Sequence, residues 1–314
     1  MTWATPDLLV SWLPPFSAAQ PVRRGVAPGL RAALLLWEEG RPVVQAVFAL
    51  RVLTGAVLAA GAGPVMVTPG TVAAALGWAA LVLATYVLNG VSDVFEDRLN
   101  GSSRPLASGR LQSRTAYRAA QLLTAGGLLL LSWSPVLLVL GVTMAAAGWA
   151  YSSGPRPLKR QSVAAALTCA AGGLLTYLAG AAAVGGRLSV AGVVVACAAA
   201  VWMAVAGAAK DLGDVAGDRA AGRRTLPVMW GETAARRRIA AATLLLAGVC
   251  LAAGHGWPLA LAAAVPMGVG ALAVAVLCCT TASLGSRARC RRPYRAFVTT
   301  QWALNASVLF TVVA

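Results

Sequence analysis

Residues 71–98 read TVAAALGWAALVLATYVLNGVSDVFEDR, and this stretch decides the fold class. It contains no charged side chain before Asp93, so its apolar part is long enough to cross a bilayer as one helix, which takes about 20 apolar residues. Three acidic side chains, Asp93, Glu96 and Asp97, then follow at its end. The stretch therefore predicts a membrane-spanning helix that ends in a group of carboxylates.

The composition of the whole chain is that of a membrane protein. Hydrophobic residues make up 59% of the 314 residues and charged residues 11%, whereas a soluble domain has about 25% charged residues. The apolar runs do not alternate as the strands of a membrane barrel do. We therefore expect an all-α polytopic membrane protein with about nine transmembrane helices. The expected spans are residues 42–64, 71–95, 113–132, 135–152, 161–183, 188–211, 232–253, 257–281 and 294–313.

The first 41 residues contain no spanning segment. We expect residues 1–41 to form a cytoplasmic N-terminal segment, in which the stretch 30–37 is a short helix lying at the membrane interface. The membrane domain then comprises residues 42–314.

The net charge of +16 would suggest nucleic-acid binding in a soluble protein. Its distribution argues against that class here, because 24 of the 26 Lys and Arg residues fall on one side of the expected membrane. Arg187 falls on the other side, and Arg51 lies inside the first span. The positively charged side is cytoplasmic. We therefore expect an integral protein of a bacterial plasma membrane, with both acidic stretches at its cytoplasmic face and no nucleic-acid partner.

The acidic stretch occurs twice. Residues 89–98 read NGVSDVFEDR and residues 210–219 read KDLGDVAGDR, so that the second aspartate pair lies 121 residues after the first. In each copy two aspartates are four residues apart, an Arg follows directly, and a Gly stands three residues further on. The chain has ten acidic residues, and six of them lie in these two stretches. Solvated loop carboxylates would explain one such stretch, but hardly two in matching register.

Spacing and charge together indicate a metal site. Residues four apart on a helix share one face, so we expect Asn89, Asp93 and Asp97 on one side of a helix end, and Asp211, Asp214 and Asp218 likewise on another. If the two ends meet, their carboxylates repel one another unless a divalent cation compensates them. Mg²⁺ prefers oxygen ligands and typically bridges carboxylates to substrate phosphates, and the arginines that follow each copy suit phosphate as well.

A third stretch, residues 151–160, reads YSSGPRPLKR. Taken alone it is a basic loop that membrane topology would explain. The chain has 24 Arg but only two Lys, and these two, Lys159 and Lys210, fall in the third stretch and in the second acidic stretch. We therefore interpret the loop as a third wall of the same site.

These three motifs, in this order, resemble those of the UbiA superfamily of intramembrane prenyltransferases. Residues 89–97, followed by RPLASG at 104–109, are similar to that family's first aspartate-rich motif and its R-P-L-x-S-G sequence. Residues 151–160 are similar to its tyrosine/lysine loop, and residues 210–227 to its second motif. The resemblance covers roughly residues 41–314.

The resemblance implies a helical bundle around a lipid-open central cavity capped by cytoplasmic loops. Mg²⁺ ions would bridge the aspartates to an isoprenoid diphosphate, and its ionisation would give an allylic cation that a small-molecule acceptor attacks. The implied metal ligands are Asn89, Asp93, Asp97, Asp211, Asp214 and Asp218. The candidate diphosphate-binding residues are Arg98, Arg104, Lys159, Arg160, Lys210 and Arg219. The candidate catalytic residues are Asp93, Asp97, Asp214, Asp218, Tyr151 and Lys159.

One position departs from the family pattern. The first motif commonly has Asp directly after the Asn, and this chain has Gly90 there, whereas the corresponding residue of the second copy is Asp211. Each acidic stretch would form one half of the metal site, and we call these halves the two half-sites. The first half-site thus has fewer carboxylates at the matching positions than the second. Aromatic side chains near the site are candidates for shielding a cation: Tyr86, Phe95, Trp149 and Trp202.

The leading functional hypothesis is an Mg²⁺-dependent transferase that joins a prenyl group to a small, aromatic acceptor. The alternative is a terpene cyclase of the same superfamily, which ionises the same diphosphate but needs no acceptor, and Gly90 gives it some weight. A transporter is disfavoured because its ionisable groups would lie near the bilayer midplane, whereas these carboxylates lie at the ends of spans. The sequence leaves the acceptor, the prenyl chain length and the oligomeric state open.

Overall fold

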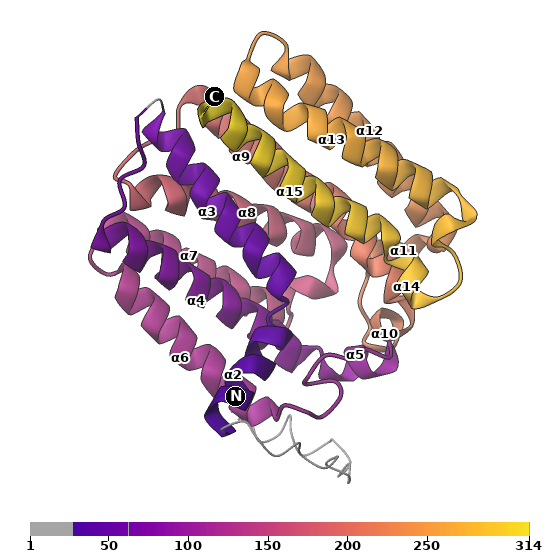
Figure 1. The fold of residues 1–314 in the computed structure, drawn as a ribbon. Helices are drawn as coiled ribbons and strands as arrows, with labels where there is room; N and C mark the ends of the chain where they lie inside the picture. The colour runs from indigo at the N-terminus through magenta and orange to yellow at the C-terminus, as the bar shows by residue number, and fades with distance from the viewer. Residues whose placement is uncertain (1–27, 62, 314) are drawn as a thin grey trace.

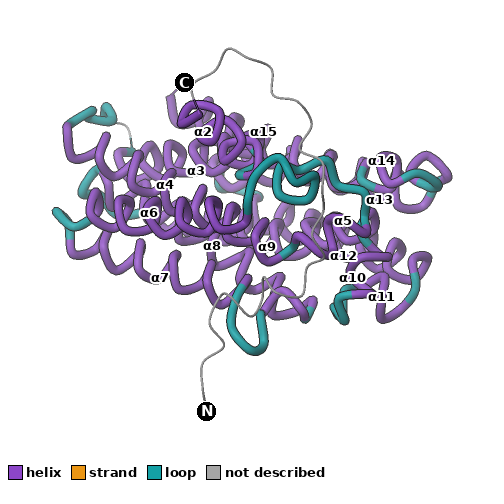
Figure 2. Tube along the Cα trace, turned by 90° about the horizontal axis from the view of Figure 1, so that it is seen from below, coloured by secondary structure: helices purple, strands orange, loops and turns teal. Residues whose placement is uncertain are grey.

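A computed structural model describes residues 28–61 and 63–313, and the regular secondary structure of this part is helical (Figure 1 and Figure 2). Nine long helices correspond to the nine expected spans within the described residues. They are α3 (Pro42–Ala60), α4 (Pro69–Ser92), α6 (Ser113–Leu131), α7 (Pro135–Ser152), α8 (Ser162–Ala183), α9 (Val190–Ala206), α12 (Glu232–Gly254), α13 (Pro258–Cys279) and α15 (Arg292–Val313). Six of them, and α9 together with the 3₁₀ segment that follows it (Val190–Gly213), are long and apolar enough to cross a membrane, and α6 and α15 are not among these seven.

Short helices gather at one end of the bundle (Figure 1). They are α2 (Pro28–Glu39), α5 (Val94–Leu99), η1 (Leu158–Arg160), η2 (Gly207–Gly213), α10 (Val215–Ala220), α11 (Leu226–Trp230), η3 (Thr281–Ser283) and α14 (Arg287–Cys290). Helix α2 confirms the short helix expected at 30–37, and its outer face exposes Leu30, Leu34 and Trp37. Its position at a membrane interface stays a prediction, and residues 1–27 lie outside the described part.

Local sequence signals explain where the long helices begin. Proline stands in the first turn of α3, α4, α7 and α13. A backbone N–H in the first turn has no acceptor within the helix, so the N–H that proline lacks costs no hydrogen bond there. The hydroxyls of Thr68, Ser134 and Ser189 accept backbone N–H bonds at the starts of α4, α7 and α9. These caps lie in the loops opposite the short helices, so they set the end of the bundle remote from the acidic motifs.

Small residues let the helices approach closely. A side chain at Gly55 of α3 would overlap the carbonyl of Tyr177 on α8, and one at Gly180 of α8 would overlap the carbonyl of Val52 on α3. Close packing through small residues is the usual way in which membrane helices associate. The helices α3, α4, α6, α7 and α8 form one half of the bundle and α9, α12, α13 and α15 the other, joined by contacts of α8 with α9 and of α3 with α15.

The charged residue inside the first span, Arg51, is 1% exposed. Its guanidinium donates a hydrogen bond of 2.6 Å to Oε1 of Gln301 on α15 and lies 4.9 Å from the ring centre of Phe48. Arg51 therefore joins the two halves of the bundle from within. It does not extend to the membrane surface.

Candidate active site

The sequence repeat is also a structural repeat. Helix α4 ends at Ser92 and α5 begins at Val94, so Asp93 lies at a break between two helices, and Asp214 lies at the corresponding break between η2 and α10. The expectation of one continuous helix face through each motif is therefore wrong. Helix α9 also gives way to the 3₁₀ segment η2 at Gly207, before the expected end at 211, and such a change of winding in mid-helix often marks a functional site.

Each copy closes with the same turn. The amide of Asp97 donates to the carbonyl of Asp93 at 2.8 Å, and that of Asp218 to the carbonyl of Asp214 at 3.0 Å. The glycines that follow, Gly101 and Gly222, have φ values of 63° and 67°, a conformation that glycine adopts without steric cost. The matching glycines of the two motifs thus reverse the chain after each short helix.

The two short helices pack against each other. The amide of Gly217 on α10 donates to Oδ1 of Asn100 at 2.8 Å, just after α5. A Cβ at Gly217 would lie 2.6 Å from the carbonyl oxygen of Glu96. Gly217 takes the place in the second copy that Glu96 has in the first, so this glycine lets the two half-sites meet.

The third motif joins them from the loop after α7. The buried ammonium of Lys159 forms an ion pair of 2.6 Å with Asp93 and also donates to the hydroxyl of Ser92. The backbone beside it is tied to the second motif, because the amide of Arg224 donates to the carbonyl of Arg160 at 2.7 Å. The three motifs therefore converge on one region.

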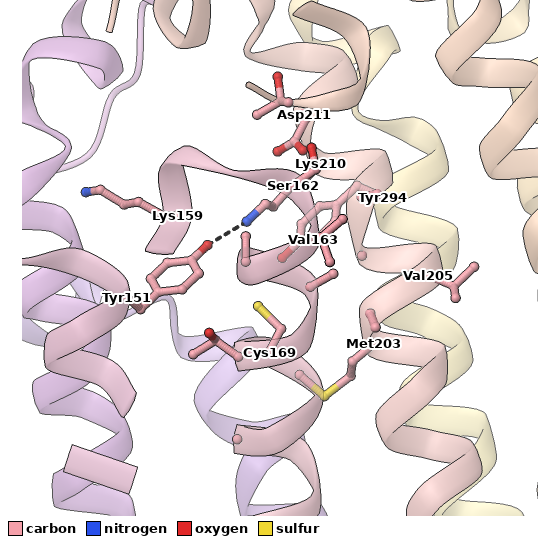
Figure 3. A pocket seen from close by; sticks show the side chains of 18 of the residues that line it. Tyr151, Lys159, Ser162, Val163, Cys169, Met203, Val205, Lys210, Asp211 and Tyr294 are labelled. Atoms are coloured by element: carbon pink, nitrogen blue, oxygen red, sulfur yellow. Dashed lines mark hydrogen bonds between the residues drawn. The ribbon is translucent and has the colours of Figure 1, made fainter. Parts of the chain in front are cut away.

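A tyrosine and a lysine connect α7 to η2. The ammonium of Lys210 donates a hydrogen bond of 2.9 Å to the hydroxyl of Tyr151. Figure 3 shows the Tyr151 ring pointing toward Lys210, with Lys159 directed away on the other side. The two lysines thus flank Tyr151.

Arg223 links the half-sites and was missed as a site residue. Its guanidinium contacts Asp93, lies 3.1 Å from Glu96 and reaches Asp218 at 3.5 Å. Burial by itself raises the pKa of the Asp93 carboxyl, but the charges of Lys159 and Arg223 outweigh it and hold that pKa below its ordinary value. The residue at the position of the first motif that corresponds to Arg223 is Ser102. Comparison of the two motifs therefore gave no reason to select this arginine.

The other carboxylates of the repeat are paired as well, with one exception. Asp97 forms an ion pair of 2.7 Å with Arg104, and Asp214 one of 2.7 Å with Arg287 of α14, a residue that the sequence analysis did not select. Within residues 28–61 and 63–313, no hydrogen bond or ion pair is formed by the carboxylate of Asp211. Nor do the side chains described hold three Asp, Glu, His or Cys residues grouped around one metal position.

A cavity of about 520 Å³ opens beside the three motifs. Its polar end is lined by Asn89, Tyr151, Lys159, Lys210, Asp211 and Arg223. Its apolar part runs along α8 from Ser162 to Gly172, about 15 Å at 1.5 Å per residue, and includes Met144 and Met203. A polar end joined to a long apolar part suits a ligand with a charged head and a hydrocarbon chain, and the volume lies in the usual range for small-molecule sites.

The structure brings some predicted residues to this cavity and leaves others aside. Asp93, Asp97, Asp214, Asp218 and Arg104 do not line it and instead form the ion pairs described above. The predicted phosphate ligands that are exposed and do not line it are Arg98, Arg160 and Arg219. Arg98 donates to the carbonyl of Ala107 at 3.1 Å.

The aromatic candidates divide in the same way. Tyr86 lines the cavity, whereas Phe95 and Trp149 are each 54% exposed and Trp202 is buried in the core. Aromatic side chains that the sequence analysis did not select, Tyr294 and Phe297 of α15, line it instead. They lie more than 60 residues from the nearest motif along the chain, so only the fold brings them there.

The side chains fit a divalent cation chemically. Oδ2 of Asp218 is buried and has no hydrogen-bond partner among the described residues. Burial raises the pKa of the Asp218 carboxyl to about 7, and neighbouring Asp211 and Asp214 add to the rise against the opposing charge of Arg223. Asn89 and Asp211 present further oxygen atoms to the cavity. Carboxylate and amide oxygens of this kind are ligands that suit Mg²⁺.

The raised pKa of Asp218 predicts how stability depends on pH. The unfolded carboxyl titrates near 4, so the folded state holds this proton more tightly, and the resulting stability is full below about pH 4 and is lost as the pH rises toward about 7. Asp218→Asn removes this dependence. In EDTA we expect the mutant to unfold at a higher temperature than the wild type at pH 8, but not at pH 5. Parallel pH profiles of the two proteins would contradict the prediction.

Comparisons with known proteins show which sequences the chain resembles. The sequence model of the UbiA prenyltransferase family matches residues 48–300. Digeranylgeranylglyceryl phosphate synthase of Halobacterium salinarum is 35% identical over 224 residues, covering 69% of this chain and 75% of the relative. The synthase of the same name from Haloquadratum walsbyi is 33% identical over 225 residues, covering 69% and 73%.

Solved structures show the same fold. A UbiA homologue from Archaeoglobus fulgidus bound to GPP and Mg²⁺ has a TM-score of 0.63 at 19% identity, covering 88% of this chain and 99% of the homologue. The apo structure of a UbiA homologue from Aeropyrum pernix has a TM-score of 0.58 at 20% identity, covering 85% and 98%. At these identities the likeness concerns the fold alone.

Proposed function

The chain belongs to the UbiA prenyltransferase family and is a membrane-embedded prenyltransferase, and from this premise we propose its donor, its acceptor and its site. The proposed donor is a long isoprenoid diphosphate, geranylgeranyl diphosphate in the first instance, and the proposed acceptor is a hydroxyl of a phosphorylated glycerol lipid. The site lies at the cytoplasmic face. A bacterial membrane stays a prediction, since the relatives named above are archaeal.

One observation carries the proposal. Asn89 on α4 and Asp211 on η2 line the same cavity, and no described residue pairs with either side chain. Three cationic groups, those of Lys159, Lys210 and Arg223, line it beside them. Oxygen ligands without partners next to an excess of positive charge are what a metal-bound diphosphate requires.

The residues of the chain then have separate roles in metal binding and diphosphate binding. Asn89, Asp93, Asp211 and Asp214 would hold Mg²⁺, with Asp97 and Asp218 completing or orienting the shell. When bound, Mg²⁺ neutralises negative charge on the diphosphate and so favours its departure. Lys159, Lys210 and Arg223 bind the leaving diphosphate from the cavity wall. Asp97 and Asp214 take part once they are released from Arg104 and Arg287.

The apolar part of the cavity serves the prenyl chain. The bond between C1 and the diphosphate oxygen breaks, and both electrons leave with the diphosphate. The acceptor oxygen forms a bond to C1, and its proton passes to the released diphosphate. Cation–π contacts stabilise positive charge in a water-poor cavity, and Tyr86 and Tyr294 present aromatic rings to it. The hydrocarbon walls around Met144 and Met203 exclude water that would otherwise capture the cation.

Two further arginines favour an anionic acceptor. Arg41 and Arg238 line the cavity, and neither pairs with a carboxylate among the described residues; Arg238 instead stacks on Trp230, with its guanidinium 3.7 Å from the ring centre. Arginine suits phosphate. The name of the archaeal relatives describes a glyceryl phosphate with two geranylgeranyl groups, which fits a second phosphate here. We prefer this acceptor to the small aromatic one expected from the sequence.

The test uses purified protein in lipid nanodiscs with Mg²⁺ and C10, C15 or C20 diphosphate. Diphosphate release and extracted products are followed with geranylgeranylglyceryl phosphate, with a small aromatic acid, or with no acceptor. Turnover that requires the glyceryl phosphate supports the proposal, and loss in EDTA supports the metal. Turnover that requires the aromatic acid contradicts the proposed acceptor, and a cyclic hydrocarbon formed without acceptor makes the protein a terpene cyclase.

The space at the inner end of the cavity is expected to limit the length of the prenyl chain that the donor can have. Gly172 lines it, and a Cβ there would lie 3.7 Å from Sδ of Met144, so a larger side chain must extend into the space for the prenyl chain. We expect Gly172→Leu to lower the ratio of C20 to C10 turnover about tenfold, since one or two methylenes in a pocket discriminate by that order. The matched control is Gly126→Leu on the exposed face of α6, and a ratio lowered equally in both variants would contradict the prediction.

A further inference from the structure

The space beside Gly90 is filled by another residue's carboxylate. Gly90 is buried in α4, and a Cβ built on it would overlap Oε1 of Glu39 and lie 2.8 Å from a guanidinium nitrogen of Arg104. Glu39 is the last residue of α2, and its side chain is fully buried. The position that carries Asp211 in the second copy is thus glycine in the first, and a glutamate from elsewhere occupies the adjacent space.

Glu39 is held there by specific contacts. One carboxylate oxygen lies 2.5 Å from Nη2 of Arg104, and the other accepts the backbone N–H of Leu106 at 3.0 Å. Nη1 of the same Arg104 donates to Asp97 at 2.7 Å. Arg104 therefore lies between two carboxylates, one from the N-terminal helix and one from the first motif. Burial of a carboxylate is costly unless it is paired and hydrogen-bonded, as it is here.

When Glu39 is counted with the residues at the matching positions, the two half-sites have the same number of carboxylates. The second copy has Asp211, Asp214 and Asp218, whereas the first has only Asp93 and Asp97 at the matching positions. We propose that Glu39 is the first half-site's counterpart of Asp211, and that it acts as a positioning residue through Arg104. The proposal rests on the Mg²⁺-dependent function proposed above.

The physical effect is on Asp97. With Glu39 ionised, the charge of Arg104 is divided between two carboxylates, and Asp97 keeps negative charge that a nearby cation attracts. With Glu39 neutral, Arg104 adds an uncompensated positive charge to the half-site and pairs with Asp97 alone. Changing a partner behind a metal ligand commonly weakens metal binding roughly 10- to 100-fold. Glu39 is thus expected to strengthen Mg²⁺ binding without touching the metal.

The neighbouring glutamate provides a matched control. Glu38 pairs with Arg110 at 2.5 Å, but this pair is at the surface, with side chains 48% and 42% exposed. Both glutamates tie α2 to the loop after α5, and only Glu39 connects to Asp97. An anchoring role would be shared by the two residues, whereas an effect on the metal site would be specific to Glu39.

The first experiment measures Mg²⁺ binding without turnover. Thermal unfolding of wild type, Glu39→Gln and Glu38→Gln is followed against Mg²⁺ concentration in the presence of a non-hydrolysable prenyl diphosphate analogue. We expect the Mg²⁺ midpoint of Glu39→Gln to rise at least tenfold, with Glu38→Gln at the wild-type value and Glu39→Asp in between. An unchanged midpoint in Glu39→Gln overturns the proposal. A wild type whose unfolding does not respond to Mg²⁺ would instead contradict the proposed function.

The second experiment moves the carboxylate from position 39 to position 90. It is carried out in EDTA, so its result does not depend on the metal. Gly90→Asp alone places two carboxylates in one buried space, and Glu39→Ala alone leaves Arg104 without its partner, so we expect both to unfold at lower temperature. The double variant E39A/G90D has one carboxylate beside Arg104 again and is expected to recover most of the loss. The comparison variant E39A/G90A fills the space without charge. Equal recovery in E39A/G90A, or no recovery in E39A/G90D, overturns the proposal.

Discussion

Asp211→Asn is expected to reduce diphosphate release about 100- to 1000-fold while leaving the unfolding temperature near the wild-type value. The carboxylate lines the cavity and forms no ion pair within the described part of the chain, so its removal orphans no neighbouring charge. Asparagine keeps the size and one oxygen but loses the negative charge that attracts a cation. The magnitude is that of removing one well-placed electrostatic group from an active site. Initial rates of diphosphate release, at a Mg²⁺ concentration that just saturates the wild type, measure it.

The control for Asp211→Asn is Glu38→Gln, which removes the same charge at an exposed position away from the cavity. Raising the Mg²⁺ concentration should recover part of the lost rate in Asp211→Asn, because the metal is bound more weakly and not excluded. A rate equal to that of the wild type would remove Asp211 from the proposed metal shell, and with it the main support for the proposed site.

Asp93→Ala is expected to reduce both activity and stability. Asp93 is the shared partner of Lys159 and Arg223, whose side chains are only 4% and 12% exposed. Removing one member of a buried ion pair costs about 3 to 5 kcal/mol, because it leaves the opposite charge unpaired. We expect a loss of that size in the free energy of unfolding, measured by denaturant titration in detergent, together with loss of diphosphate release.

The double variant D93A/K159M separates the two effects of Asp93→Ala. It removes the orphaned ammonium, so part of the stability should return while the activity stays lost. The pKa of Asp93 is lowered in the folded protein, which fixes how its contribution to stability depends on pH. The ion pairs of Asp93 stabilise the fold above about pH 4, the ordinary carboxyl range, and this stabilisation is lost as the pH falls further. If Asp93→Ala unfolds like the wild type, the ion pairs at this residue do not hold the three motifs together.

The two half-sites differ in how their charges are arranged. The first half-site obtains a buried carboxylate from α2, and the second carries its own in Asp211. The reason lies in the winding of the helices, since α4 stays α-helical to Ser92 whereas α9 changes to the 3₁₀ segment η2. A Cβ at position 90 would meet Glu39 of α2, whereas the side chain at the corresponding position of the second copy, Asp211, lines the cavity.

Local sequence determined the helices, the two acidic motifs and the family. Apolar runs of about 20 residues and prolines in first turns act within one segment, so they could be recognised without the fold. The repeated spacing of aspartate, arginine and glycine likewise survives as a repeated turn, with Gly101 and Gly222 both at positive φ. The break at Asp93 and Asp214 did not follow from helical periodicity, because a continuous helix and a kinked one share the same spacing.

Tertiary structure alone decided which charges meet. Arg223 lies 130 residues from Asp93 along the chain, Arg287 lies 73 residues from Asp214, and Glu39 lies 65 residues from Arg104. It also left Arg98, Arg160 and Arg219 outside the cavity that their sequence positions suggested. Ion pairs form through space at a few ångströms, and the pairing of three loops at one end of a bundle depends on how all nine long helices pack, which no single segment encodes.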